Sequence, residues 1–432
     1  MKAAETAYLV TGGNRLQGKA CVQGAKNAAL PMIAAALLVQ RGESVIRNVP
    51  ALQDIYVQIE LARSVGARVD YDAREHILLI DASAVSNSVL DPELTRKSRG
   101  SILFLPPLLH RLGAVEFHGS GGCSLGARKM GFHQNGLKRL GARIEGTHDQ
   151  FRIEAERLRG NLLYLDIPSH TGTENLMMAA ALASGSTIIE NAASDPEVVD
   201  LANLLGSMGA VIHGAGTGTI LVEGVPELHA AEYTVMPDRL DAAGLVMASA
   251  ITQGDTALVG AELDRMRVLV AKLGQMGVRI SSDGPVVRVR GPERLKPVNI
   301  ITWPYPGFST DLQPGIMALA AVADGRSYIR ENMFENRFSQ IEGLNALGAR
   351  ITRKENLAEV EGVESLTGTS VSAHDIRAGM ALVLAGLAAE GKTLIENAYQ
   401  INRGHLELDQ RLKNLGAQID CVTDTSSYRV AV

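Results

Sequence analysis

Cysteine is scarce in this sequence, with only Cys21, Cys123 and Cys421, far apart along the chain. Three cysteines cannot form the disulfide framework of a small secreted domain, and no two have the spacing of metal ligands. The scarcity of cysteine is typical of a protein that works in the reducing cytoplasm. Because Cys21 and Cys421 lie in strand-like runs, we expect them to fill the core.

An apolar stretch long enough to cross a membrane is also missing. The longest wholly apolar run, residues 28–39, has 12 residues and contains Pro31, whereas a spanning helix needs about 20. The start of the chain has no apolar segment of signal-peptide length. We therefore predict a soluble cytoplasmic protein without a membrane partner.

Neither a basic excess nor many aromatic residues are present. Lysine and arginine number 42 and aspartate and glutamate 47, so the net charge is 42 − 47 = −5. General nucleic-acid-binding proteins normally carry a basic excess, so nucleic acid is not an expected partner. Aromatic residues make up only 4%, while glycine reaches 44 of 432 residues. This composition indicates many tight turns and a core of small aliphatic side chains.

At roughly 150 residues per domain, the length of the chain allows two large domains or three ordinary ones.

The chain contains a sixfold repeat. A hydrophobic residue, Gly-Ala or Gly-Val, a variable residue and then Val or Ile recur, with the glycine at Gly66, Gly141, Gly209, Gly277, Gly348 and Gly416. These glycines are 75, 68, 68, 71 and 68 residues apart. Each signature follows an amphipathic stretch. We therefore expect its glycine to end a helix in the left-handed conformation, with a strand beginning after it.

A second series of glycines lies about halfway between the first, at Gly42, Gly113, Gly185, Gly254, Gly325 and Gly391. Most of them follow a nearly apolar helix that must be buried, predicted at residues 28–38, 175–183, 242–252, 315–323 and 378–389. Each repeat then holds one buried helix, one amphipathic helix and several short strands. Two closed groups of three repeats cover the buried helices better than an open solenoid does. A crevice between two lobes is a natural ligand site.

Several polar residues in glycine-bearing loops are candidates for function. Lys26 precedes an apolar helix, and a helix N-terminus favours an anion; an ordinary surface lysine is the alternative. Cys123 and Arg128 share the loop GSGGCSLGAR, where cations favour the reactive thiolate. An inert core cysteine is the alternative there.

The second half of the chain offers acidic residues and arginines in similar loops. Asp311 and Asp375 stand just before apolar helices, so a helix N-cap is the alternative role for each. Arg337, Arg377 and Arg403 could each be ordinary salt-bridge partners. Taken one at a time, these residues do not define a site.

Together, the segments GAKNAALP, GGCSLGAR, FSTDLQP, FENRF, DIRAG and INRG resemble the enolpyruvyl transferases, with similar spacing over essentially the whole chain. The resemblance implies an α/β fold of six βαβαββ repeats in two pseudo-threefold domains, sometimes called an inside-out α/β barrel. One domain is expected at residues 26–236 and the other at 1–25 plus 237–432. The active site is expected in the cleft between them.

The implied reaction moves the enolpyruvyl group of phosphoenolpyruvate to the 3-hydroxyl of UDP-N-acetylglucosamine and releases phosphate, which is the first committed step of peptidoglycan synthesis. It needs a proton for the methylene carbon, a base near the hydroxyl, and cations for a phosphate and a carboxylate. Side-chain cations can balance the substrate charge, so neither a metal nor an organic cofactor is implied. The sequence does not indicate an oligomeric state.

The resemblance also assigns roles to individual residues. Cys123 would be the general acid and the target of fosfomycin, Asp311 the base, and Lys26 a further catalytic residue. The phosphoenolpyruvate-binding residues would be Lys26, Asn27, Arg128, Arg337, Arg377 and Arg403. The UDP-sugar-binding residues would be Asn27, Arg99, Arg128, Lys129, Ser169, His170, Asp311 and Met333.

The chain departs from the family pattern in two regions that face the uridine and diphosphate in the family. Residues 129–132 read KMGF where proline and aspartate are common at the first and third positions, and residues 169–172 read SHTG in place of Ser-Val-Gly-Ala. Lys129 and His170 could compensate with diphosphate contacts. Another hydroxyl acceptor, such as a nucleotide, therefore stays open. 3-Phosphoshikimate is disfavoured, because the shikimate enzyme lacks the cysteine loop. A catalytically silent nucleotide-sugar-binding homologue is the third alternative.

Overall fold

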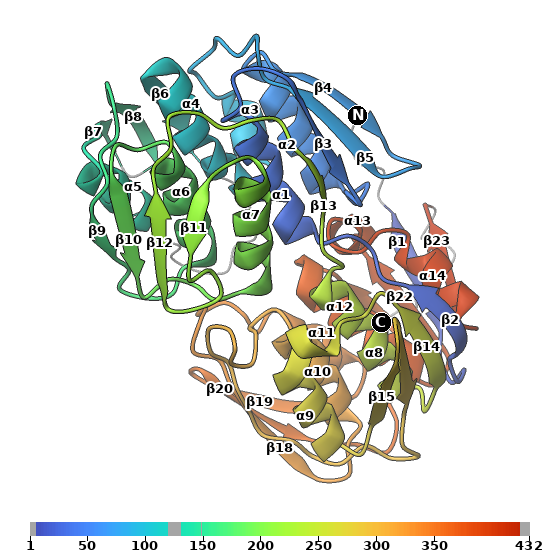
Figure 1. Ribbon diagram of the computed structural model, residues 1–432. Coiled ribbons are helices and arrows are strands. Elements are labelled where there is room, and N and C mark those ends of the chain that lie inside the picture. Colours follow the sequence, from blue (N-terminus) through green and yellow to red (C-terminus); the bar gives the residue numbers. More distant parts are fainter. Residues whose placement is uncertain (1–5, 120–130, 148, 424–432) are drawn as a thin grey trace. The chain divides into compact units, whose positions relative to one another are not determined.

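The computed structural model describes residues 6–119, 131–147 and 149–423, which form two compact units (Figure 1). Among the described residues, unit 1 is built from 6–23 and 237–423, and unit 2 from 24–119, 131–147 and 149–236. The chain passes between the units after Gln23 and again after Met236.

Short strands recur throughout both units. Those of unit 2 are β3 (Glu43–Arg47), β4 (Arg68–Asp72), β5 (Ile77–Asp81), β6 (Ala114–His118), β7 (Arg143–Gly146), β8 (Gln150–Glu154), β9 (Leu162–Tyr164), β10 (Ser186–Glu190), β11 (Val211–His213), β12 (Thr219–Glu223) and β13 (Glu232–Thr234). Those of unit 1 are β1 (Ala7–Thr11), β2 (Gln17–Cys21), β14 (Asp255–Val259), β15 (Arg279–Asp283), β16 (Val286–Arg290), β17 (Ile300–Ile301), β18 (Arg326–Arg330), β19 (Arg350–Lys354), β20 (Leu357–Glu361), β21 (Ser370–Ser372), β22 (Lys392–Glu396) and β23 (Gln418–Val422).

The helices alternate with these strands. Unit 2 contains α1 (Lys26–Ala36), α2 (Gln53–Ser64), α3 (Pro92–Thr95), the 3₁₀ helix η1 (Arg99–Phe104), α4 (Leu105–Leu112), α5 (Gly131–Arg139), α6 (His170–Ala181) and α7 (Pro196–Ser207). Unit 1 contains α8 (Arg239–Ile251), the 3₁₀ helix η2 (Leu263–Met266), α9 (Arg267–Gln275), α10 (Gln313–Ala321), α11 (Gln340–Ala346), α12 (Ile376–Ala388), α13 (Ala398–Asn402) and α14 (Leu408–Asn414).

The strands form three sheets in each unit, all built on one plan. The orders are β13-β3-β5-β4, β9-β10-β12-β11 and β6-β8-β7 in unit 2, and β2-β14-β16-β15, β17-β18-β20-β19 and β21-β22-β1-β23 in unit 1. Each sheet has three antiparallel strands. In five of them, a fourth strand pairs in parallel at one edge. The α/β class and the sixfold repeat are therefore confirmed.

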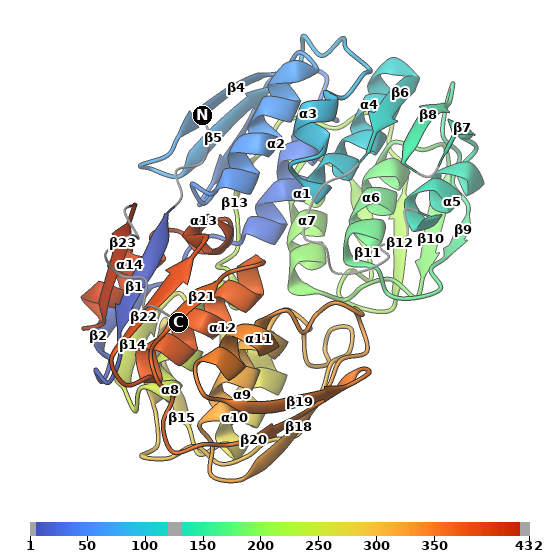
Figure 2. The same cartoon turned by 180° about the vertical axis from the view of Figure 1, so that it is seen from behind.

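The start of the chain completes the last repeat of unit 1. In that sheet β1 lies between β22 and β23 and pairs antiparallel with both, and Figure 2 shows this blue strand among red ones. In each of the other five sheets, the strand between the two antiparallel neighbours comes directly after the edge strand in the sequence, as β5 comes after β4. Residues 7–11 therefore fold with residues that lie about 400 positions further on.

The signature glycines behave as the sequence predicts. All six have φ between 90° and 108°, in the left-handed region that suits glycine. A strand begins two residues after each one, at β4, β7, β11, β15, β19 and β23. In the second series Gly254 differs, because Gln253 takes the left-handed conformation with φ 55°. A Cβ on Gly254 would lie 2.5 Å from the carbonyl oxygen of Leu16, so the close backbone approach requires glycine there.

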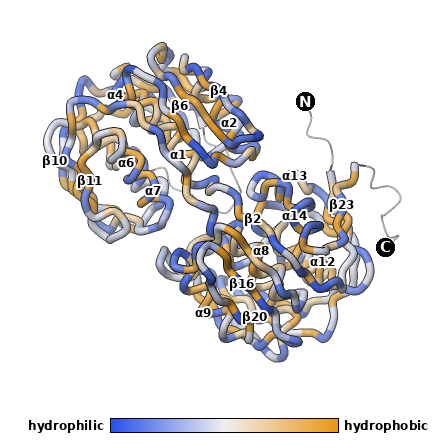
Figure 3. The backbone as a smooth tube through the Cα atoms, turned by 45° about the vertical axis from the view of Figure 1, so that its right-hand side comes forward, coloured by the Kyte–Doolittle hydropathy of each residue, from blue (hydrophilic) through white to orange (hydrophobic). Residues whose placement is uncertain are grey.

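The nearly apolar helices are buried, as expected. All 13 residues of α8 and all nine of α10 are buried. Along α12 the tube in Figure 3 is orange for most of its length, while strands such as β20 alternate in colour. One face of each sheet therefore covers the buried helices and the other faces water.

The three buried helices of unit 1 approach one another closely. A Cβ on Gly315 in α10 would lie 2.6 Å from Met247 Cε of α8 and 3.4 Å from Leu384 Cδ1 of α12. Alanine at this position would force Met247 to move. Among the described residues, no helix is both long and apolar enough to span a membrane.

The prediction that Cys21 and Cys421 fill the core is wrong, because both are exposed. In β2 the inward side chain is Ala20, so Cys21 points to the opposite face. Cys421 lies near the end of β23, an edge strand of its sheet. An exposed edge leaves such a residue without a covering layer.

Candidate functional site

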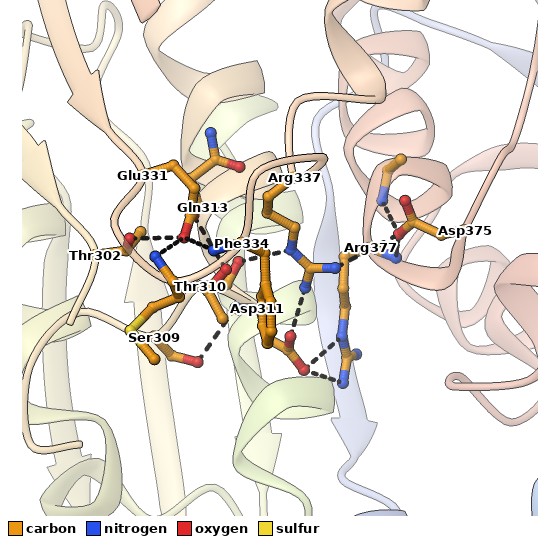
Figure 4. Close-up of polar contacts among 12 residues, drawn as sticks. Thr302, Ser309, Thr310, Asp311, Gln313, Glu331, Phe334, Arg337, Asp375 and Arg377 are labelled. Carbon is orange, nitrogen blue, oxygen red and sulfur yellow. Dashed lines mark hydrogen bonds and ion pairs between the residues drawn. The ribbon is translucent and has the colours of Figure 1, made fainter. Parts of the chain in front are cut away.

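A carboxylate held by two arginines forms the centre of the candidate site in unit 1 (Figure 4). Asp311 Oδ1 accepts a hydrogen bond from Arg337 Nη2, and its Oδ2 lies 3.1 Å from Arg377 Nη2 and 3.2 Å from Arg377 Nε. Arg337 is only 2% exposed, whereas the Asp311 side chain is 27% exposed. The three residues come from sequence positions up to 66 apart and meet at one point.

The backbone around Asp311 is fixed by a buried glutamate that follows β18. Glu331 Oε1 accepts from Thr302 Oγ1 at 2.9 Å, and Oε2 accepts from Thr310 Oγ1 at 3.0 Å. The same carboxylate accepts from the backbone N–H of Met333 at 2.8 Å. Glu331 therefore holds both the loop before α10 and the loop that carries Met333. Figure 4 shows its contacts with Thr302 and Thr310.

Asp375 and Asp311 differ in their relation to the following helices. Asp375 is the N-cap of α12, and its side chain accepts from the N–H groups of Arg377 and Ala378. The N-cap of α10 is Leu312, without a side-chain cap, so the capping alternative does not apply to Asp311. Asp375 also lies 3.9 Å from Arg337 Nη1. Capping and charge pairing thus fix both arginines.

Arg403 lies beside this cluster, at the C-cap of α13. Its Nη1 donates to Gln400 Oε1 at 3.2 Å. A Cβ on the next residue, Gly404, would lie 3.7 Å from Arg377 Nη1. The structure therefore brings three predicted arginines of unit 1 to one region.

In unit 2, Lys26 is the first residue of α1 and is buried, so it is not an ordinary surface lysine. Its Nζ lies 3.0 Å from Asp54 Oδ2 in α2, and the two side chains are 7% and 9% exposed. Such a pair holds the ammonium group in one place. Asn27, the next residue, is half-buried at the same helix end.

Arg99 is the first residue of η1. Hydrogen bonds of Asn175 connect this helix with α5 and α6. Asn175 Nδ2 in α6 donates to the carbonyl of Ile102 in η1 at 3.2 Å and to His133 Nδ1 in α5 at 2.9 Å. Burial, assisted by the charge of Arg99, lowers the pKa of His133 to about 3. His133 is therefore neutral, and Nδ1 is free of a proton and accepts from Asn175.

Ser169 and His170 begin α6. Ser169 is the N-cap and accepts from the N–H of Gly172 at 3.2 Å. His170 Nε2 lies 3.0 Å from Glu174 Oε1. Burial opposes protonation of His170, but the Glu174 carboxylate outweighs it and raises the pKa of His170 to about 10. His170 is therefore protonated at neutral pH and forms an ion pair with Glu174.

Some predicted residues cannot be placed. Cys123, Arg128 and Lys129 lie outside the described residues. Met333 is half-buried in the loop held by Glu331. Among the residues that are described, no group of three or more His, Cys, Asp or Glu side chains could hold a metal ion.

Sequence reasoning missed Glu331 and Asp54. Glu331 directly follows an alternating strand, and Asp54 lies in the first turn of an amphipathic helix. Both look like ordinary surface acids in the sequence. Only the fold shows that each one is buried against a predicted site residue.

The fold and these side chains together indicate which kind of ligand the protein can bind. The α/β repeats bring buried guanidinium groups and a carboxylate to one region of unit 1, and cationic side chains to the starts of helices in unit 2. Such groups suit a small, strongly anionic substrate, and the Asp311 carboxylate lies beside them.

The chain belongs to the enolpyruvyl transferase family, because the family model EPSP synthase (3-phosphoshikimate 1-carboxyvinyltransferase) matches residues 10–412. A curated relative from Thermobifida fusca, named UDP-N-acetylglucosamine 1-carboxyvinyltransferase, is 50% identical over 422 residues and covers 96% of this chain and 98% of the relative. UDP-N-acetylglucosamine 1-carboxyvinyltransferase 1 of Symbiobacterium thermophilum is 47% identical, with 96% and 95% covered. The predicted family is confirmed.

Solved structures agree on the fold. The enolpyruvyl transferase NikO from Streptomyces tendae superposes with a TM-score of 0.87 at 28% identity, covering 97% of this chain and 99% of that one. EPSP synthase from Acinetobacter baumannii gives a TM-score of 0.75 at 18% identity, covering 96% and 100%. The second likeness bears on the fold alone.

Proposed function

We propose that this protein transfers the enolpyruvyl group of phosphoenolpyruvate to the 3-hydroxyl of UDP-N-acetylglucosamine with release of phosphate. The observation that supports this most is the Asp311 carboxylate between Arg337 and Arg377. The relatives that share 43–50% of their residues with nearly the whole chain carry the name of this activity. The product would enter peptidoglycan synthesis, and the reaction would take place in the cytoplasm.

The arginine pair suits the carboxylate of phosphoenolpyruvate. Arg337 and Arg377 already bind one carboxylate, that of Asp311. When the substrate carboxylate binds, it shares these guanidinium groups and reduces their hold on Asp311. Asp311 then becomes a better acceptor for the proton of the attacking hydroxyl. Arg403 adds positive charge for the phosphate.

We assign the remaining roles as the resemblance implies. Lys26, Asn27 and Arg128 would bind phosphoenolpyruvate, and Cys123 would give a proton to its methylene carbon. The hydroxyl oxygen then bonds to the central carbon. Elimination then removes a proton from the resulting methyl group, restores the carbon–carbon double bond, and breaks the bond between the central carbon and the phosphate oxygen, so that phosphate leaves. Residues of both units would thus serve one reaction.

The UDP-sugar would be bound chiefly by residues at helix N-termini, where an anion is favoured. Arg99 begins η1, Ser169 caps α6, and the cationic His170 follows it. A cationic histidine there supports the idea that this chain uses His170 for the diphosphate. Lys129 and Met333 would complete the set.

A phosphate-release assay tests the proposal. Phosphoenolpyruvate is supplied with UDP-N-acetylglucosamine, with UMP, or with shikimate 3-phosphate as acceptor. We expect release with the first acceptor only. Phosphate release with UMP alone would overturn the assignment of UDP-N-acetylglucosamine as the acceptor. No release with any of the three acceptors would favour a catalytically silent binding protein. Fosfomycin should label the wild type but not Cys123→Ala.

A further inference from the structure

The segment after Arg403 is clamped by a side chain distant in the sequence. Gln23 Nε2 donates to the carbonyl of Gly404 at 3.1 Å, and its Oε1 accepts from the N–H of Leu406 at 2.7 Å. One amide therefore binds the backbone on both sides of His405. Gln23 is 8% exposed, so little water competes for these bonds.

The clamp is itself anchored by a buried carboxylate. Asp241 in α8 accepts from the backbone N–H of Gln23 at 3.3 Å and lies 3.0 Å from His405 Nδ1. Arg411 binds both oxygens of Asp241, and its Nε donates to the carbonyl of Leu406 at 2.8 Å. Burial raises the pKa of Asp241, but Arg411, with the hydrogen bond from His405, outweighs burial and lowers it below the usual range.

Every residue from Gly404 to Leu406 is therefore held by a side chain. These bonds fix the chain directly after Arg403, whose own side chain extends from the end of the short helix α13. The clamping residue also occupies a special place in the chain. Gln23 is the last residue of unit 1 before the chain enters unit 2, and its carbonyl accepts from the N–H of Asp238 at the return point, at 2.8 Å.

We infer that Gln23 is a positioning residue for Arg403, fixing the 403–406 segment so that the guanidinium group is ready for the anion of phosphoenolpyruvate. This inference rests on the proposed function. Gln23 itself does not touch the reacting atoms; it acts through the backbone of Gly404 and Leu406. Its loss should therefore weaken phosphoenolpyruvate binding far more than acceptor binding.

The test replaces Gln23 by methionine, which keeps the length of the side chain but can neither donate to Gly404 nor accept a strong hydrogen bond from Leu406. The matched control is Asn345→Leu, because Asn345 makes the same kind of clamp in unit 1. Its Nδ2 donates to the carbonyl of Ile351, and its Oδ1 accepts from the N–H of Ile351, both at 3.0 Å. Gln23→Ala, which leaves room for water, serves if the methionine variant does not fold.

Steady-state kinetics and urea unfolding are measured for the wild type and all variants. We expect Gln23→Met to raise the KM for phosphoenolpyruvate about tenfold, which corresponds to about 1.4 kcal/mol. The KM for UDP-N-acetylglucosamine should change less than twofold. Asn345→Leu should lose stability but keep both KM values. Equal KM changes for both substrates, or the same kinetic pattern in both variants, would overturn the inference. A wild type inactive with every acceptor would instead refute the proposed function.

Discussion

Replacing Asp311 by asparagine should separate catalysis, stability and anion binding. Asparagine has nearly the same shape but no charge, so Arg337 and Arg377 lose their shared counter-charge. Removing one partner of a buried ion pair costs about 3–5 kcal/mol. Asp311 is 27% exposed and Asp375 remains 3.9 Å from Arg337, so we expect a loss of about 2 kcal/mol of unfolding free energy.

Binding of phosphoenolpyruvate should change in the opposite direction. In the proposed function, the substrate carboxylate of the wild type would compete with Asp311 for the two guanidinium groups. In Asp311→Asn this competition is gone, so we expect about threefold to tenfold tighter binding, or roughly 1 kcal/mol. Turnover should fall by about 10²–10⁴, because asparagine cannot act as the base that we propose Asp311 to be.

Urea unfolding, calorimetric titration with phosphoenolpyruvate and phosphate release provide the three measurements. Asp255→Asn is the control, since Arg290 Nε lies 2.8 Å from Asp255 Oδ2 but both side chains are about half exposed. Such surface pairs contribute at most about 1 kcal/mol, and neither binding nor turnover should change. Weaker phosphoenolpyruvate binding in Asp311→Asn, with its fold intact, would refute the competition between the two carboxylates.

Three further outcomes follow from the same structure. Asp54→Asn should lower the unfolding free energy by about 3 kcal/mol, because it leaves the buried Lys26 ammonium without its carboxylate, and urea unfolding should show this. Arg403→Ala should raise the KM for phosphoenolpyruvate far more than that for the sugar; the reverse would assign Arg403 to the sugar. Because the pKa of His170 is raised to about 10, its contribution to stability is complete below pH 6.5 and is lost as pH rises towards 10. Unfolding measured from pH 6.5 to 10 should therefore show a steeper decline in the wild type than in His170→Gln.

The repeat could be predicted because its signals are local. A glycine such as Gly348 must end a helix in the left-handed region, and the strand that follows buries Ile351 between exposed neighbours. These requirements involve only neighbouring residues. The same reasoning failed for Cys21, because the face to which a strand residue points depends on what the sheet packs against.

The contacts of the site could not be predicted, because they join distant parts of the chain. Asp311 and Arg377 are 66 residues apart, and Gln23 and Leu406 are 383 apart. No local pattern distinguishes Gln23 from a surface glutamine. The resemblance to a family predicted most of the site residues. It could not show that Asp54 pairs with Lys26 or that Glu331 holds the loop of Met333.

The predicted and observed starts of the buried helices differ, and these differences have a common physical origin. The nearly apolar helices are predicted to begin at residues 28, 175, 242, 315 and 378, whereas the structure begins each of them two to five residues earlier. A buried helix can be apolar along most of its length, but the N–H groups of its first turn need polar partners. Side chains that can accept a hydrogen bond therefore collect there, and Ser169 and Asp375 are examples. Since the same N–H groups favour anions, polar residues just before a wholly apolar helix are good candidates for a binding site in proteins built on this plan.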